Sequence, residues 1–193
     1  MTSTIEPSQQ DGSVKPWKTL SSSMALNEKW FPVRKDTVQL PSGKVIDDYF
    51  IYESPHIVMV VPVTPDGRFV LVRQYRHGIG KIVCQPPGGA VDKNETLEAA
   101  AKREMEEETG YTSNELIHLG TSAPNATKSN TTEDIFIALN VTQGGHKQYD
   151  AQEESEVLLM TKEQLLASLD SKEIQMSDMF ASMYLALRYL GHM

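Results

Sequence analysis

Most of the chain alternates between short apolar runs and turn-forming residues, a pattern typical of β-strands. The continuous apolar run at 57–63 predicts a buried strand, and the alternating pattern at 68–75 predicts another. The turn sequence PSG at 41–43 separates two runs that we expect to pair as a β-hairpin. The expected strands cover residues 37–40, 44–52, 57–63, 68–75, 82–84, 116–122, 135–141 and 157–160.

One longer segment, between Asn94 and Gly110, has the spacing of an amphipathic helix. At about 100° per residue, its apolar positions form a single stripe. That stripe consists of Leu97, Ala100, Ala101 and Met105. Asn94 is a plausible N-cap, Glu95 places negative charge in the first turn, and Gly110 fits the left-handed position that ends many helices.

The same helix carries an unusual run of carboxylates. Glu104, Glu107 and Glu108 are spaced so that they share one face, which continues the apolar stripe. Carboxylates directed towards a core repel one another and are costly to desolvate, so a bound cation is the simplest remedy. All-oxygen ligands suit Mg²⁺ or Mn²⁺, and Arg103 can brace Glu107 four residues later. The alternative is an ordinary solvated acidic face.

Two further helices are expected after the last strand. Thr161 and Gln164 have the spacing of a capping box, which starts a helix that runs to about Leu169. Ser177 can cap a last helix that ends near Leu190. Strands, helix, strands and helices in this order predict an α+β fold, an α/β/α sandwich with a mixed β-sheet between helices.

Length and charge narrow the class of protein. The 193 residues carry a formal net charge of −8, so we expect no general attraction for nucleic acid or an anionic membrane. We interpret residues 1–16 as a flexible tail and 17–193 as a single domain, with an N-terminal hairpin extension at about 30–54. The lone Cys84 excludes a disulfide within the chain, and no signal-peptide core or membrane-spanning run is present. A cytoplasmic protein is the simplest interpretation.

The residues of this helix and of the loop before it also match a longer sequence pattern. The positions that fit the pattern G-x5-E-x7-R-E-U-x-E-E-x-G-U are Gly89, Glu95, Arg103, Glu104, Met105, Glu107, Glu108, Gly110 and Tyr111. The chain therefore resembles the Nudix hydrolases, which share this signature. Tyr111 departs from the pattern, which asks for a bulky aliphatic residue, but an aromatic ring also buries apolar surface. The resemblance implies the Nudix fold and cleavage of a nucleoside diphosphate linked to another moiety.

Within that family the chain looks most like the ADP-ribose and nucleoside-diphosphate-sugar pyrophosphatases. This closer resemblance rests on PSGKV in the early hairpin, VRQYR at 72–76, the Pro-Gly pair before the signature from Gly89 to Tyr111 (the Nudix box), Pro124 after it, and EESE at 153–156. The resemblance implies Mg²⁺-dependent hydrolysis to a nucleoside monophosphate and a sugar phosphate, with Mn²⁺ as a substitute. A homodimer is expected on the same grounds, with the N-terminal hairpin near the interface.

The resemblance also implies roles for individual residues. Glu104, Glu107 and Glu108 would hold the metal together with the backbone carbonyl of Gly88, and Arg103 would orient the glutamates. Glu95 would help to fix the loop before the helix. In this subfamily a glutamate from a later loop can act as base, and the candidates here are Glu153 and Glu154, with Glu156 behind them.

Four residues outside the helix are candidate substrate contacts. Arg73 and Arg76 could each bind a phosphate or form a structural ion pair, and Trp30 could stack on the nucleobase or pack in a core or interface. Pro124 lies in the loop after the box. Gln85 stands where relatives often have glutamate, which weakens any case for a metal ligand at that position.

Two other functions stay open. One is a Nudix enzyme of another nucleotide class, acting on nucleoside triphosphates or dinucleotides. The early hairpin and the VRQYR segment argue against triphosphates, because triphosphate enzymes of the family tend to be shorter. The other is a non-catalytic ligand sensor, but such proteins tend to lose box carboxylates, and this chain keeps every one.

Overall fold

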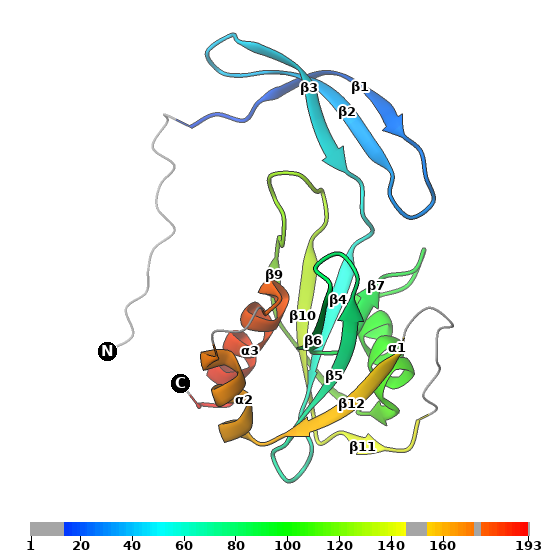
Figure 1. Cartoon of the computed structure of the whole chain (residues 1–193), viewed down its shortest axis with the longest axis vertical. Coiled ribbons are helices and arrows are strands. Elements are labelled where there is room, and N and C mark those ends of the chain that lie inside the picture. The colour runs from blue at the N-terminus through cyan, green and yellow to red at the C-terminus, as the bar shows by residue number, and fades with distance from the viewer. Residues whose placement is uncertain (1–13, 146–153, 172–174, 193) are drawn as a thin grey trace. The chain divides into compact units, whose positions relative to one another are not determined.

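The computed structural model describes residues 14–145, 154–171 and 175–192 (Figure 1). Contacts divide the chain into two compact units. Unit 1 holds Met1–Ser54 and Thr127–Asn130, and unit 2 holds Pro55–Ala126 and Thr131–Met193. The sequence suggested one domain with an N-terminal extension at about 30–54; unit 1 contains that extension, the residues before it and a short piece of a later loop.

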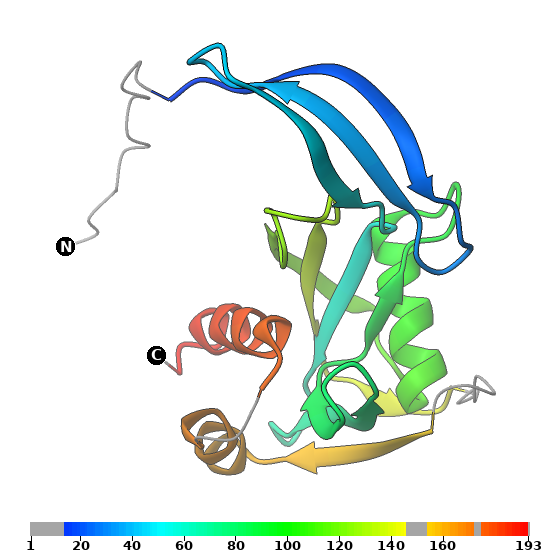
Figure 2. The same ribbon diagram turned by 45° about the horizontal axis from the view of Figure 1, so that its top comes forward.

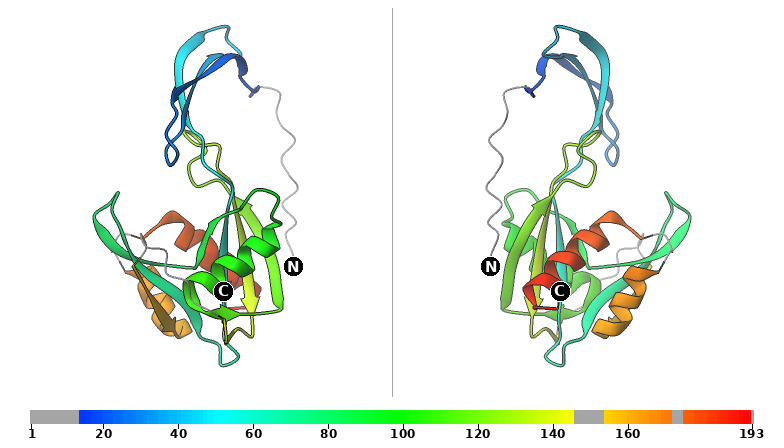
Figure 3. Two further views of the ribbon diagram at one scale, coloured as in Figure 1. Left: turned by 90° about the vertical axis from the view of Figure 1, so that its right-hand side faces the viewer. Right: turned by 90° about the vertical axis from the view of Figure 1, so that its left-hand side faces the viewer.

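Unit 1 is a three-stranded antiparallel sheet in the order β1-β2-β3 (Figure 3). Its strands are β1 (Lys18–Leu26), β2 (Val33–Gln39) and β3 (Val45–Tyr52). β2 pairs with β3 across the PSG turn, which confirms the predicted hairpin. β1 was not predicted, because its sequence KTLSSSMAL shows little alternation and all nine of its residues are exposed.

The described residues of unit 1 contain no helix to cover the sheet. Many large apolar side chains are therefore exposed in this unit. They are Val14, Trp17, Leu20, Met24, Leu26, Trp30, Phe31, Val45 and Phe50. The loop piece of unit 1 is tied to β3, since the Tyr52 N–H donates to the Lys128 carbonyl at 2.8 Å and the Tyr49 hydroxyl to the Thr127 carbonyl at 2.7 Å.

Unit 2 is built on a mixed four-stranded sheet in the order β7-β4-β10-β9. Its strands are β4 (Ile57–Pro62), β7 (Gly88–Ala90), β9 (Glu115–Ser122) and β10 (Glu133–Leu139). β10 runs parallel to β4 and antiparallel to β9, and β7 pairs antiparallel with β4. The short β7 is therefore an edge strand, and it leads into the predicted helix.

A second, antiparallel sheet has the order β12-β5-β6. It consists of β5 (Phe69–Arg76), β6 (Lys81–Gln85) and β12 (Ser155–Met160). A small pair, β8 (Tyr111–Thr112) and β11 (Thr142–Gln143), lies after the end of the helix.

In the described residues of unit 2, three helices cover the sheets: α1 (Leu97–Thr109), α2 (Lys162–Asp170) and α3 (Ser177–Tyr189). One core cluster joins Ala100, Ala101 and Met105 of α1 to Val58, Val60, Val70, Phe136, Ala138 and Val141. The other joins Met179, Met183, Ala186 and Leu187 of α3 and Leu165 of α2 to Val61, Val63, Phe69, Leu71 and Ile137. Alternate residues of β4 thus face opposite layers, and Figure 2 shows α1 on one side of the sheet with α2 and α3 on the other. The predicted α/β/α sandwich is confirmed.

Some helix caps lie where the sequence predicted them, and others do not. Gly110 adopts φ 72° after α1, and Thr161 and Gln164 form the capping box of α2, both as predicted. The N-cap of α1 is Thr96, not Asn94, because Asn94 adopts a left-handed φ of 69° and turns the chain before the helix.

Two more helix-start predictions were wrong. Glu95 precedes α1 instead of lying in its first turn, because the cap falls at Thr96. Ser177 is the first residue of α3, whose N-cap is Met176 without a side-chain cap bond.

No helix in the described ranges has the length and apolar character needed to cross a membrane.

Candidate active site

The edge strand β7 presents its backbone to α1. The Val60 N–H donates to the Pro87 carbonyl and the Val91 N–H to the His56 carbonyl, each at 2.9 Å. Because antiparallel pairing alternates, the N–H and C=O of Gly88 point away from β4. The Gly88 N–H donates to Glu108 Oε2 at 3.0 Å, which ties the strand edge to the last turn of α1.

Gly89 lets a second glutamate of α1 approach the backbone. A Cβ built at Gly89 would lie 2.6 Å from the carboxyl carbon of Glu104, closer than any real Cβ contact. The carboxylate therefore packs directly on the glycine, which any side chain would prevent. At Gly88, a Cβ would instead lie 2.2 Å from the backbone carbonyl oxygen of Val58.

Arg103 is the centre of the hydrogen-bond network. Its Nε and Nη2 donate to the two carboxylate oxygens of Glu95 at 3.0 and 2.9 Å. Its Nη1 donates to Glu104 at 2.7 Å and to Glu107 at 3.2 Å, and Nη2 also reaches the Ala90 carbonyl at 2.9 Å. One guanidinium thus joins the loop before the helix to two glutamates of the helix.

This network is half-buried, and its charges stabilise one another. The hydrogen bond with Glu95, followed by those with Glu104 and Glu107, raises the pKa of Arg103 above its usual value. In return, the Arg103 guanidinium lowers the pKa of Glu95. The side chain of Glu104 is 14% exposed and that of Glu107 is 34% exposed, so both remain within reach of a ligand from solvent.

The donor chemistry of this cluster fits a hard divalent cation. Glu104, Glu107, Glu108 and the outward-facing Gly88 carbonyl are all oxygen donors, which Mg²⁺ and Mn²⁺ prefer. In the part of the chain that the structure describes, no three His, Cys, Asp or Glu side chains are arranged to enclose an ion. Arg103 binds two of the carboxylates, so an ion and the guanidinium would share them.

The two arginines of the VRQYR segment have different surroundings. Arg76 Nε and Nη2 donate to Gln85 Oε1 at 3.1 and 2.9 Å, and Gln85 is 2% exposed at the end of β6. Gln85 therefore fixes Arg76 beside the proline link that leads to Gly88, a role that its sequence position did not reveal. Arg73 lies on the exposed end of β5 and forms an ion pair with Glu156, the structural alternative raised for it.

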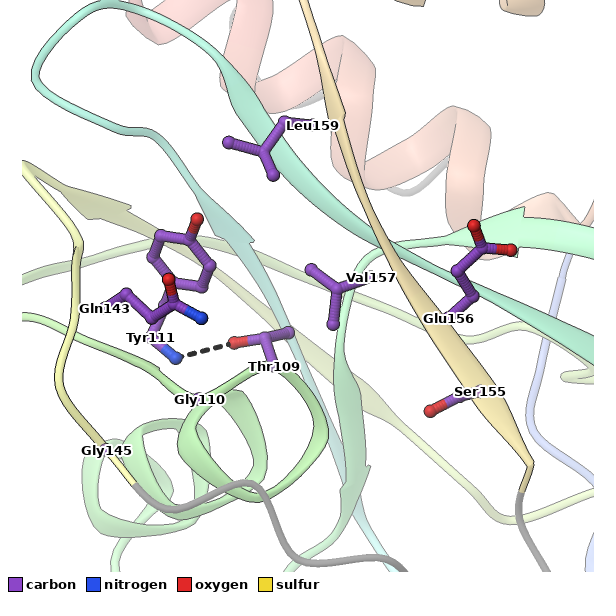
Figure 4. Close-up of a pocket in the computed structure, with 9 residues that line it drawn as sticks. All are labelled: Thr109, Gly110, Tyr111, Gln143, Gly145, Ser155, Glu156, Val157 and Leu159. Carbon is purple, nitrogen blue, oxygen red and sulfur yellow. Dashed lines mark hydrogen bonds between the residues drawn. The ribbon is translucent and has the colours of Figure 1, made fainter.

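The base candidates lie at the start of β12. Glu153 is outside the described residues, and Glu154 is exposed directly before the strand. Glu156 pairs with Arg73, and Figure 4 shows its carboxylate turned away from Ser155 and Val157.

A cavity of about 630 Å³ lies between this strand and the C-terminal end of α1 (Figure 4). It is lined by the end of α1 and the start of β8, by β11 and the residues after it, and by β12. The lining residues are Thr109, Gly110, Tyr111, Gln143, Gly145, Ser155, Glu156, Val157 and Leu159. The helix contributes only its last residue, Thr109, and the following Gly110 to this lining, and neither Glu107 nor Glu108 is among the lining residues.

The remaining substrate candidates, Trp30 and Pro124, are both exposed. Trp30 is 75% exposed in the β1–β2 connection of unit 1, with the Lys29 ammonium 4.3 Å from its ring centre. Pro124 is exposed in the β9–β10 loop of unit 2.

Two protein-family models match the chain. The NUDIX domain matches residues 54–182, and the nucleoside diphosphate sugar hydrolase N-terminal domain matches residues 17–52. The two matches meet close to the boundary between units 1 and 2.

Similar proteins agree with these models. An ADP-ribose pyrophosphatase of Bacillus subtilis is 29% identical over 173 residues, which cover 89% of this chain and 93% of the relative. An ADP-sugar pyrophosphatase of Mus musculus is 34% identical over 108 residues, half of each chain. A crystal structure described as an ADP compounds hydrolase superposes with a TM-score of 0.81 at 20% identity, covering 94% of this chain and 99% of its own, and so confirms the fold.

Proposed function

The chain belongs to the Nudix family and is a hydrolase of pyrophosphate bonds, and we propose that it cleaves the diphosphate of ADP-ribose or a related nucleoside diphosphate sugar. The products would be a nucleoside monophosphate and a sugar phosphate. The observation that carries this choice is the match of unit 1 to the N-terminal domain of nucleoside diphosphate sugar hydrolases. The relatives named as ADP-ribose and ADP-sugar pyrophosphatases support it.

Metal binding is assigned to the cluster on α1. Glu104, Glu107, Glu108 and the Gly88 carbonyl would hold Mg²⁺, with Mn²⁺ as a substitute. When bound, Mg²⁺ supplies neutralisation of the diphosphate charge and activation of the attacking water. The Gly88 N–H holds Glu108 in place, and Gly89 leaves room for Glu104 beside the strand.

Arg103 and Glu95 have a positioning role in this proposal. Arg103 keeps Glu104 and Glu107 on the same side of α1 through charged hydrogen bonds. Glu95 holds the other edge of the guanidinium and accepts the Asp92 N–H at 3.1 Å, so the loop and the helix are fixed together. Prearranged carboxylates bind a cation without first losing side-chain freedom.

Proton transfer is assigned to Glu153 or Glu154. Glu154 is exposed and directly precedes Ser155, which lines the cavity beyond the last turn of α1. A carboxylate there can take a proton from water during in-line attack on phosphorus. Glu156 is the weaker candidate, because Arg73 already binds its carboxylate.

Substrate binding is assigned to the two arginines, with Trp30 and Pro124 as further candidates. Arg76, held by Gln85, would bind a phosphate near the β6–β7 link. Arg73 would do so only after exchanging its ion pair with Glu156. Trp30, whose ring is exposed, would stack on the nucleobase, and Pro124 would line the sugar side.

A homodimer is part of the proposal. The exposed apolar side chains of unit 1, among them Trp17, Met24 and Leu26, are the surface that pairing of two chains would cover. Light scattering that gives the mass of one chain would refute the dimer. The cytoplasmic location expected from the sequence stays a prediction.

The test is a substrate panel with Mg²⁺, resolved by liquid chromatography. It contains ADP-ribose, GDP-mannose, UDP-glucose, NADH, diadenosine polyphosphates and normal and oxidised dGTP. AMP and ribose 5-phosphate as main products would support the proposal, and similar rates on several nucleotide sugars would support a broad hydrolase. Cleavage of triphosphates or dinucleotides alone would refute the substrate class while leaving the metal helix intact. Binding without turnover would favour the sensor.

A further inference from the structure

A buried carboxylate outside the proposed site is held by two histidines. Asp134 of β10 is 5% exposed and accepts hydrogen bonds from His56 Nε2 at 2.5 Å, from the Thr121 hydroxyl at 2.7 Å and from His118 Nε2. His56 Nδ1 contacts the Thr132 hydroxyl at 2.5 Å. Burial raises the pKa of Asp134, but the three hydrogen bonds outweigh burial and hold it below its usual value.

His56 lies where this cluster meets the metal-binding segment. It directly precedes β4, near the start of unit 2, and strand ends fray unless they are tied down. Asp134 and Thr132 hold both nitrogens of its ring, while its carbonyl accepts the Val91 N–H at 2.9 Å. That bond continues the β4–β7 ladder to the residue after Ala90.

From Val91 onward, hydrogen bonds lead to the glutamates of α1. Asp92, next to Val91, donates its N–H to Glu95 at 3.1 Å, and Glu95 binds Arg103 through both oxygens. The Ala90 carbonyl, on the other side of Val91, accepts from Arg103 Nη2 at 2.9 Å. Both neighbours of Val91 thus connect to the guanidinium that binds Glu104 and Glu107.

We propose that His56, held by Asp134, is a positioning residue for the metal-binding helix. Its fixed ring anchors the backbone at Val91, and this sets the loop from which Glu95 and the Ala90 carbonyl hold Arg103. The inference rests on the proposed function, because it concerns the same metal site. The test compares a variant on this hydrogen-bonded route with a variant off it.

His118 provides the matched control. It binds the same carboxylate, but from β9, and its ring packs against Phe136 at a centroid distance of 5.1 Å. Within the described residues, this hydrogen bond and ring contact reach Asp134 and Phe136, and neither lies in the loop after Val91. Loss of His118 should therefore lower stability without changing the metal site.

Mg²⁺ binding is measured on the full chain, without substrate, from the rise in Tm with Mg²⁺ concentration, and the half-saturating concentration is the dissociation constant fitted to that rise. Replacement of groups that orient metal ligands typically weakens metal binding by about 10- to 100-fold, and this more distant residue should give about 3- to 10-fold for His56→Ala. His56→Gln, whose amide can still donate to Asp134, should restore most of the affinity. His118→Ala should lower the Tm without Mg²⁺ and leave the half-saturating Mg²⁺ concentration unchanged.

Equal half-saturating concentrations for His56→Ala and the wild type would overturn the proposal, as would an equal change in His118→Ala. If His56→Ala does not fold, Asp134→Asn, which keeps the size of the side chain, replaces it with the same expected weakening. A wild type without any Mg²⁺ response would instead refute the metal site on which the proposed function depends. The two failures are therefore distinguishable.

Discussion

One buried glutamate should make the folded chain less stable as the pH rises. Glu133, the first residue of β10, is 0% exposed. Burial, followed by the nearby charge of Asp178, raises the pKa of Glu133 from 4.5 to about 7, and the Ser122 hydroxyl opposes this only in part. The folded state therefore prefers the protonated carboxyl, whereas the unfolded chain releases the proton near the ordinary value.

The direction and size of the change in unfolding free energy follow from the difference between the folded and unfolded pKa of Glu133. The stabilisation is complete below about pH 4.5, is lost as the pH rises to about 7, and stays constant above that. The pKa difference corresponds to roughly 3 kcal/mol of unfolding free energy over the full range. About 2.5 kcal/mol of this is lost between pH 5 and pH 8.

Glu133→Gln keeps the shape of the side chain and removes its titration. The unfolding free energy of the variant relative to the wild type should rise by about 2.5 kcal/mol from pH 5 to pH 8. Urea denaturation at a series of pH values, with EDTA to exclude metal binding, measures this difference and cancels the titration of all other groups. Glu98→Gln, on the exposed face of α1, is the control. A difference that does not change with pH would refute the reasoning.

Further predictions concern the proposed metal site. Glu107→Gln and Glu108→Gln should each reduce kcat by at least about 100-fold, because a bound metal contributes several kcal/mol of charge stabilisation; circular dichroism should show an intact fold, and full activity in both would contradict the assignment. Gly89→Ala should lower kcat with little change in Tm, because the atoms nearest its Cβ are those of the Glu104 carboxylate, at the end of a side chain that can move. Gly88→Ala should lower the Tm, because its Cβ meets the backbone of Val58. A larger loss of Tm in Gly89→Ala than in Gly88→Ala would disprove this distinction. EDTA should abolish activity, Mg²⁺ should restore it, and saturating Mg²⁺ should raise the Tm; an unchanged Tm would argue against a metal site in the folded chain.

The parts of the fold that depend on local pattern could be predicted. The period of α1, its end at Gly110 and the capping box at Thr161 depend on neighbouring residues, and the structure has all three. The shared face of Glu104 and Glu107 follows from the same periodicity, and both bind Arg103.

Other features depend on contacts that the sequence does not display. β1 has a mostly polar sequence and is a strand because it pairs with β2 along its whole length. Thr96 and Asn94 are both good caps by residue type, and only the left-handed turn at Asn94 decides between them. The bond between Arg76 and Gln85 joins two strands across a hairpin, and the cluster around Asp134 joins residues up to 78 positions apart.

Arg103 offsets part of the repulsion among the carboxylates of α1. From the sequence, their mutual repulsion called for a cation. The structure shows that a guanidinium supplies part of that charge, since Arg103 binds Glu95, Glu104 and Glu107, while Glu108 binds the Gly88 N–H. One positive charge does not balance four carboxyl groups, so the cluster keeps an excess of negative charge on the face next to β7. A diphosphate would be repelled from that face unless divalent cations neutralise both partners, and this is why metal binding should precede or accompany substrate binding.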